Sequence, residues 1–230
     1  MPIEAILTDV TRMRVANVCI AAIVNDKPIR LDSPQPNDNW IQSIGGLAPG
    51  DVVSVDWKPT KGATPPHTED GEWDSSSLKK LRHLTDSELT AILSARAFDS
   101  VQDAFGAPAI RGTGGNAAFS PGKGRRSLAS ILAHSVRVYP QIEGIKVDFT
   151  DSKDTWTRVP LEDLIIRKHQ KQCRTCSRRL SALLANEFQG ANAILRVGLA
   201  RQFQAGRHPS ACWMQVNHIF LMPSKRKHFV

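Results

Sequence analysis

The chain of 230 residues is long enough for one large domain or two compact ones, and its 41% hydrophobic and 23% charged residues exclude a disordered or fibrous protein. No run of about 18 apolar residues is present, which excludes a membrane-spanning helix, and the first residues lack an export pattern, so we expect a cytoplasmic protein without a membrane partner. Residues 1–106 carry 10 Lys and Arg against 15 Asp and Glu, whereas residues 107–230 carry 20 against 7. The basic half favours a polyanionic partner, and a basic surface that only aids solubility is the alternative.

The first 57 residues predict short strands separated by turns. Residues 3–10 and 15–24 are rich in β-branched and small apolar residues, and residues 52–57 alternate apolar and polar side chains. The stretch at 26–39 is dense in Asp, Asn, Pro and Ser, and it predicts a loop. Short strands with such turns are typical of a small barrel or sandwich.

The pattern then becomes helical. Residues 84–98 predict a helix, because Thr85 and Glu88 can form a capping box and an apolar face follows them. Residues 98–106 predict a further helical piece that ends at Gly106, which is a candidate domain edge.

Strand patterns return in the second half, at residues 128–139, 144–151, 154–161, 194–203 and 212–222. Five strands with an insertion between the third and the fourth is the plan of an OB barrel, and the first half can follow the same plan. We therefore predict a mainly β protein of two tandem OB-like β-barrels with a short α-helical connector. The expected parts are an N-terminal domain at 1–106, a glycine-rich linker at 107–127 and a basic C-terminal domain at 128–230.

Several stretches of sequence together form a pattern found in a known family. They are RVANVCIAAI, NWIQSI and LAPGDVVSV in the first 55 residues, PPHTEDGEW at 65–73, and RVGLARQF and CWMQVNHIF near the end. They resemble the dual OB-fold domain proteins of bacterial conflict and anti-phage loci. The resemblance implies two OB modules that handle nucleic acid in antiviral defence, beside a protein partner such as a nuclease or helicase subunit. The glycine-rich segment and the CRTC loop depart from the family pattern.

The segment GTGGNAAFSPGKGRRS at 112–127 is rich in glycine and basic residues. It is not a nucleotide P-loop, because Ala117 stands where the first glycine is needed and Gly124 replaces the hydroxyl residue. The segment either contacts phosphates from a flexible support or is a disordered linker with incidental charge. Its candidate phosphate-binding residues are Arg111, Lys123, Arg125 and Arg126.

The stretch HQKQCRTCSRR at 169–179 contains a possible zinc site. Cys173 and Cys176 have the C-x-x-C spacing, His169 lies four residues upstream, and His208 or Cys212 could complete four ligands. Such a zinc would be structural, and ordinary reduced thiols are the alternative. The surrounding cations predict a clamp on a phosphate backbone, formed by Arg167, Lys168, Lys171, Arg174, Arg178 and Arg179.

Exposed aromatic side chains are expected where an OB barrel stacks bases. Trp156 is the favoured candidate, because Lys153 and Arg158 flank it at a predicted hairpin, whereas Phe149 and Trp213 are expected in the core. Tyr139 and Phe203 are further candidates.

His67, Glu69 and Asp70 do not by themselves supply a nucleophile, a base and an orienting group, so we predict no enzyme. The sequence therefore favours a nucleic-acid-binding accessory protein, with single strands preferred and DNA and RNA both possible. The acidic first half would dock a protein partner or aid solubility. The alternatives are a protein-interaction scaffold whose basic half meets an acidic subunit, and a metal-dependent hydrolase.

Overall fold

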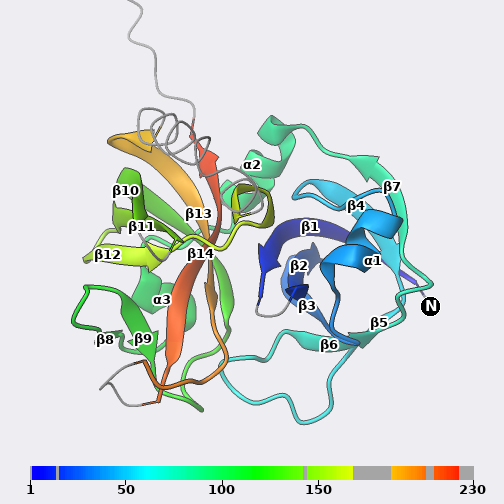
Figure 1. Ribbon diagram of the computed structural model, residues 1–230, viewed down its shortest axis with the longest axis horizontal. Helices are drawn as coiled ribbons and strands as arrows, with labels where there is room; N and C mark the ends of the chain where they lie inside the picture. The colour runs from blue at the N-terminus through cyan, green and yellow to red at the C-terminus, as the bar shows by residue number, and fades with distance from the viewer. Residues whose placement is uncertain (1, 14–15, 142–143, 168–187, 206–209, 223–230) are drawn as a thin grey trace, which may run out of the picture.

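Two seven-stranded sheets form the protein, one from each half of the chain (Figure 1). The structure is a computed structural model that describes residues 2–13, 16–141, 144–167, 188–205 and 210–222. The predicted mainly β class is confirmed. Among these residues, no helix has the length and apolar character needed to cross a membrane.

The first sheet curls into a barrel, called here the first barrel. Its elements are β1 (Ile3–Arg12), β2 (Val18–Val24), β3 (Lys27–Ser33), α1 (Asp38–Ser43), β4 (Asp51–Val55), β5 (Trp57–Pro59), β6 (Asp70–Trp73) and β7 (Lys79–His83). Strands β1, β2 and β3 form an antiparallel meander, β4 pairs with β1, and β6 runs parallel to β3. Only Asp56 separates β4 from β5, which pairs with β6, so one bent strand closes the ring. With α1 between the third and fourth strands, this is the OB layout.

The second sheet repeats this plan as the second barrel. Its elements are β8 (Ile110–Arg111), β9 (Ala117–Phe119), β10 (Leu128–Gln141), β11 (Gly144–Thr150), β12 (Thr155–Pro160), β13 (Ala191–Leu199) and β14 (Cys212–Leu221). Strands β10, β11 and β12 form the meander, β13 pairs with β10, and β14 pairs with β13. A parallel bridge links Leu161, which directly follows β12, to Val216 of β14. It joins the third strand of the OB layout to the fifth.

Two short helices connect the barrels, α2 (Asp86–Ser94) and α3 (Val101–Phe105). The predicted capping box is confirmed at α2, where Glu88 N–H donates to the Thr85 hydroxyl and Thr85 N–H donates to the Glu88 carboxylate. The predicted end of α3 is confirmed at Gly106, which has a φ of 66°.

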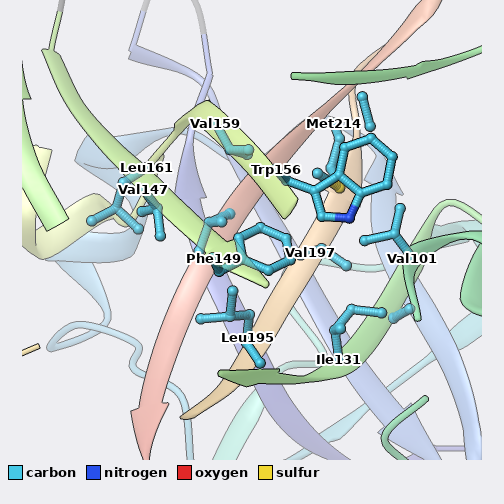
Figure 2. Packing of buried hydrophobic residues seen from close by; sticks show 14 of the residues in the cluster. Val101, Ile131, Val147, Phe149, Trp156, Val159, Leu161, Leu195, Val197 and Met214 are labelled. Carbon is cyan, nitrogen blue, oxygen red and sulfur yellow. The ribbon is translucent and has the colours of Figure 1, made fainter. Parts of the chain in front are cut away.

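Each barrel has its own apolar core, and a third cluster joins them. In the second barrel, Trp156 and Phe149 lie among aliphatic side chains from the surrounding strands (Figure 2). The third cluster packs Leu89 and Leu93 of α2 with Val52 of the first barrel and Ile194 of the second. The two barrels therefore share buried surface, which opposes independent movement.

Three details differ from the sequence predictions. Residues 27–33, predicted as part of a loop, form β3, because Ile29 and Leu31 are buried and the polar Arg30 between them is buried in an ion pair. Residues 38–43, expected within strands and turns, form α1, whose cap is the Asn37 side chain. The sequence does not predict strand β7, because all five of its residues are exposed.

The glycine-rich segment predicted as a linker also differs. Within residues 110–119, β8 pairs with β9, and β9 pairs in turn with β14. The side chains of Ala117, Ala118 and Phe119 are buried, and Phe119 belongs to the core of the second barrel. Helix α3 packs into the same core, so the second barrel takes in residues before 128.

Candidate nucleic-acid interface

The glycines of the turn between β8 and β9 allow close packing against β12. Thr157 Oγ1 donates to the Gly114 carbonyl at 2.9 Å, and Thr157 N–H donates to the Gly115 carbonyl at 3.1 Å. A Cβ on Gly115 would lie 2.0 Å from Thr157 Oγ1, and one on Gly112 would lie 2.7 Å from the Trp213 ring. Glycine is therefore needed at these positions for close packing within the second barrel, because a side chain would not fit.

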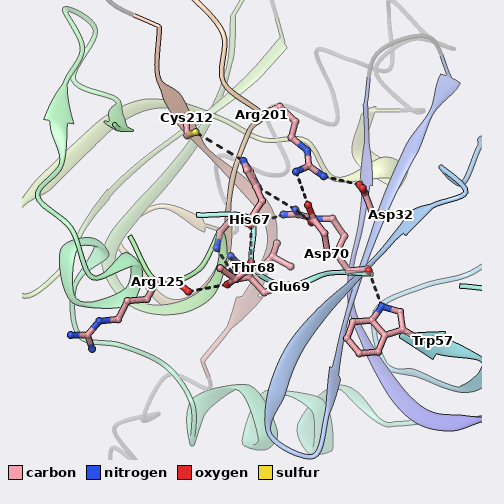
Figure 3. A network of polar contacts seen from close by, with 12 residues as sticks. Asp32, Trp57, His67, Thr68, Glu69, Asp70, Arg125, Arg201 and Cys212 are labelled. Atoms are coloured by element: carbon pink, nitrogen blue, oxygen red, sulfur yellow. Dashed lines mark hydrogen bonds and ion pairs between the residues drawn. The ribbon is translucent and has the colours of Figure 1, made fainter. Parts of the chain in front are cut away.

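The second part of the segment docks on the 65–69 loop of the first barrel. Gly122 N–H donates to the Pro65 carbonyl at 3.1 Å, and Thr68 Oγ1 donates to the Arg125 carbonyl at 3.0 Å (Figure 3). Arg125 N–H also donates to the Phe105 carbonyl at 2.8 Å. The Arg125 side chain is exposed on this fixed backbone, and Lys123 is exposed beside it.

Beneath this loop, a buried polar network joins the barrels. Arg30 donates to Asp70 at 2.6 Å and to the Ser127 hydroxyl at 2.9 Å, while Glu69 accepts from Ser127 N–H at 2.7 Å. Arg201 of the second barrel also pairs with Asp70, at 2.6 Å (Figure 3). Burial raises the pKa of Glu69, although the Arg30 charge opposes this shift.

His67 is held neutral in this network. A guanidinium only donates, so Arg30 Nη1, at 3.3 Å, occupies the lone pair of His67 Nδ1. Burial and the charges of Arg30 and Arg201 lower the pKa of His67 to about 4. Cys212 Sγ lies 4.0 Å from His67 Nε2, and burial raises the pKa of this thiol. The ring therefore does not act as a base that activates Cys212, and the PPHTED stretch serves as a joint between the barrels.

Most of the predicted zinc site and basic clamp lies outside the described residues. This applies to Lys168, His169, Lys171, Cys173, Arg174, Cys176, Arg178 and Arg179. Cys212 is described and is buried at the start of β14. Within the ranges given above, no three His, Cys, Asp or Glu side chains are grouped as metal ligands.

Three of the predicted phosphate-binding cations contact the protein itself. Arg111 donates to Asp154 at 2.6 Å, and Lys153 pairs with Asp103 at 2.7 Å. The Arg126 guanidinium lies over a phenylalanine ring, 4.8 Å from its centroid. The charges of Arg111 and Lys153 are therefore partly neutralised within the protein, and the Arg126 guanidinium packs on an aromatic ring.

The prediction that Trp156 is an exposed stacking residue is wrong. Its side chain is 1% exposed, and its indole N–H donates to Asp151 at 2.9 Å. The strand alternation of β12 turns this position inward, so Trp156 fills the core beneath the hairpin (Figure 2). Phe149 is buried as predicted, whereas Trp213 is only half-buried.

The outer face of β10, β11 and β12 carries a partly exposed aromatic residue, which the buried Trp156 is not. Tyr139 of β10 is half-buried and lies opposite Lys146 of β11 in the strand register. The Arg137 guanidinium is 5.3 Å from the centroid of the Tyr139 ring, and Arg158 of β12 is exposed and close enough for its charge to act on the Tyr139 phenol. We call Arg137, Tyr139, Lys146 and Arg158 the strand-face cluster. Arg137 and Lys146 are not among the predicted contact residues, although their outward positions follow from the strand alternation.

A β-bulge places Arg158 on this face. Val147 pairs with Val159 and Phe149 pairs with Trp156, so Thr157 and Arg158 both stand opposite Asp148. Arg158 has a φ of 57°, and its backbone N–H donates to Asp148 at 2.8 Å. Without the extra residue, regular alternation would point Arg158 inward, on the same side as Trp156.

Asp148 is an acidic residue on this face, and one of its carboxylate oxygens accepts two hydrogen bonds. The Tyr139 hydroxyl donates to Asp148 at 2.8 Å, and the Arg158 N–H donates to the same oxygen. Partial burial and this carboxylate raise the pKa of Tyr139, so the phenol stays neutral at physiological pH. Asp148 thus fixes the Tyr139 ring and the bulge at Arg158.

Comparison with known proteins gives only distant likenesses. No family model matches the chain, and no curated protein matches it. Solved structures that resemble it include the p204 HINb domain, at 12% identity and a TM-score of 0.38, covering 94% of this chain and 96% of that one. A murine DNA-binding protein bound to double-stranded DNA has 8% identity and a TM-score of 0.35, covering 96% and 97%. These scores do not identify a function, which is therefore inferred from the residues of this chain.

Proposed function

We propose that the protein is a non-enzymatic nucleic-acid-binding protein and that the strand-face cluster is its principal contact surface. The observation that carries this proposal is the grouping of three cations around the half-exposed Tyr139 on the first three strands of an OB-like barrel. OB barrels bind oligonucleotides over this part of the sheet. Cations that follow a phosphate backbone, with an aromatic ring for a base, are the elements of single-strand binding.

The cluster favours a single strand because its contacts are of two kinds. Arg137, Lys146 and Arg158 can neutralise phosphates, which gives affinity without sequence preference. The Tyr139 ring can stack on an unpaired base, which a duplex does not offer. Both DNA and RNA meet these requirements, because no contact in the cluster depends on the 2′-hydroxyl group.

Lys123 and Arg125 are a second group of exposed cations, near the junction of the barrels. Their backbone is tied to α3 and to the 65–69 loop, so the two side chains project from a fixed support. A bound strand that reached them would gain further phosphate contacts without ordering a loose segment.

The experiment is a salt titration of binding with the purified chain. Fluorescence anisotropy is measured with a fluorescein-labelled 20-nucleotide oligo(dT), a matched oligo(U) and a duplex of the same length. We expect the strongest binding to a single strand and an affinity that falls steeply with salt, because each neutralised phosphate releases a counterion. Salt-independent binding, or no binding to any of the three, would refute the proposal.

We further propose that the protein serves as an accessory of an antiviral defence system and holds a structural zinc through Cys173 and Cys176. The sequence resemblance supports the first part, and the C-x-x-C spacing supports the second. Elemental analysis of the wild type and of a Cys173→Ser/Cys176→Ser variant tests the zinc. We expect about one zinc per chain in the wild type and none in the variant. Equal zinc content in both proteins would refute the site.

A further inference from the structure

A cavity on the first barrel lies between the end of β3 and the paired strands β5 and β6. Its volume is about 610 Å³, and its walls include two tryptophans and three carboxylates, which are Trp57, Trp73, Asp56, Glu72 and Asp74. Trp57 and Trp73 stand opposite each other in the β5–β6 register. None of these residues belongs to the proposed nucleic-acid surface.

The two tryptophans have fixed orientations. Trp57 Nε1 donates to the Arg30 carbonyl at 3.1 Å (Figure 3), and Trp73 Nε1 donates to the Pro34 carbonyl at 2.7 Å. Trp57 lies directly over Gly71, where a Cβ would come within 1.9 Å of the indole nitrogen. Trp40 of α1 packs edge-on against Trp73, with ring centroids 5.1 Å apart. Trp73 is 6% exposed and belongs to the core of the first barrel, so the half-buried Trp57 supplies most of the indole surface that a ligand can reach.

The rim of the cavity is acidic. The Lys58 ammonium, 2.8 Å away, lowers the pKa of Glu72, and hydrogen bonds from Ser76 lower the pKa of Asp74. Both groups are therefore ionised at physiological pH. Among the lining residues Lys58 stands against three carboxylates, and the neighbouring Lys61 also lowers the pKa of Glu72, so the rim carries a small net negative charge.

We propose that this cavity binds an arginine side chain of a basic peptide segment from a protein partner. A guanidinium combines a flat face that stacks on indole rings with donors that reach carboxylates, and its aliphatic stem suits apolar walls. The charge of the rim repels phosphate groups, so a nucleic acid would not be the occupant. The first barrel would thus recruit a basic partner while the second holds the nucleic acid. This inference does not depend on the proposed nucleic-acid binding.

The experiment titrates the full chain with acetyl-Gly-Arg-Arg-Gly-amide and follows binding by isothermal titration calorimetry. The matched probe carries citrulline in place of both arginines, which keeps the shape and removes the charge. We expect measurable binding of the arginine peptide that weakens as salt rises, and at least about fivefold weaker binding of the citrulline peptide. Equal binding of the two peptides, or no binding of either, would overturn the proposal.

Variants with opposite expected effects locate the site. Glu72→Gln/Asp74→Asn should weaken binding of the arginine peptide about threefold or more, because two rim charges are removed. Lys58→Gln should strengthen it, because Glu72 loses its present partner, and a damaged fold would not give this gain. Glu4→Gln, which removes an exposed carboxylate elsewhere on the first barrel, is the control and should bind like the wild type. A Lys58→Gln protein that bound more weakly, or a Glu4→Gln protein as weak as the double variant, would contradict the site. Oligonucleotide affinity should stay unchanged in all of them, so a failure here is separable from a failure of the proposed function.

Discussion

Arg196 of the second barrel donates to Asp9 of the first barrel, with Nη2 2.8 Å from Oδ2 and Nε 3.1 Å from Oδ1. The two side chains are 3% and 0% exposed. The hydroxyl groups of Thr8 and Ser130 accept further hydrogen bonds from this guanidinium, each at 3.1 Å. The barrels are therefore joined by a buried, hydrogen-bonded ion pair as well as by the apolar cluster around α2.

Asp9→Asn should lower the free energy of unfolding by about 3–5 kcal/mol, because the Arg196 charge would stay buried without its carboxylate. Lys153→Gln, which breaks the exposed pair with Asp103, should change it by less than about 1 kcal/mol. Urea unfolding followed by tryptophan fluorescence measures both variants. A similar small loss in the two would show that the buried pair does not hold the barrels together.

Mild acid should destabilise the wild type through His67. The folded-state pKa of about 4 lies below the ordinary value for histidine, so the unfolded chain takes up the proton first. The stability that neutral His67 allows is complete above the ordinary pKa of about 6.5. As the pH falls from there towards 4, the free energy of unfolding should drop by about 1–2 kcal/mol, after allowance for partial hydration of the ring. Urea unfolding at pH 7 and pH 4.5 should show a larger loss for the wild type than for His67→Gln. Parallel losses in the two proteins would contradict the account of this network.

Gly115→Ala should destabilise the protein more than Gly122→Ala. Both glycines have positive φ, 83° and 73°, so each substitution carries a backbone cost of about 1 kcal/mol. Only Gly115 is also in close contact, since a Cβ there would meet Thr157 Oγ1 at 2.0 Å, whereas nothing lies within 4 Å at Gly122. The difference in Tm between the two variants measures the packing of the turn against β12. Equal Tm values would mean that this turn is not packed there.

Substitution of Trp156 should affect stability, and substitution of Tyr139 should affect oligonucleotide binding. Trp156→Phe should lower stability by about 1–3 kcal/mol, through a smaller core side chain and the lost bond to Asp151, and leave oligonucleotide affinity unchanged. Tyr139→Ala should weaken oligo(dT) binding by about 1–3 kcal/mol, the usual value of one stacked base, with a smaller effect on stability. Anisotropy at a temperature where both variants are folded tests this pair. The opposite pattern would restore Trp156 as the stacking residue.

The regular parts of the fold could be predicted from local sequence, and the site could not. Alternating strands at 128–161 and the capping box at Thr85 depend on neighbouring residues, so the sequence predicts them correctly. Strand β3 was missed because its buried Arg30 is satisfied by Asp70, 40 positions away. Arg158 is among the predicted contact residues, but the bulge that turns it outward depends on pairing with β11. Charge counts also overstate the free cations, since Arg196, Arg111 and Lys153 have carboxylate partners in the fold.

The most direct test of the strand-face cluster is the affinity of Arg158→Gly for labelled oligo(dT), measured together with its Tm. Glycine fits the φ of 57° better than arginine does, so this variant loses a cation without strain in the backbone. Lys27→Gln, which removes an exposed cation at the start of β3 in the first barrel, is the control for charge alone. We predict affinity about fivefold or more below that of Lys27→Gln, with a Tm equal to or above that of the wild type. Wild-type affinity in the Arg158→Gly protein would contradict the assignment of this face.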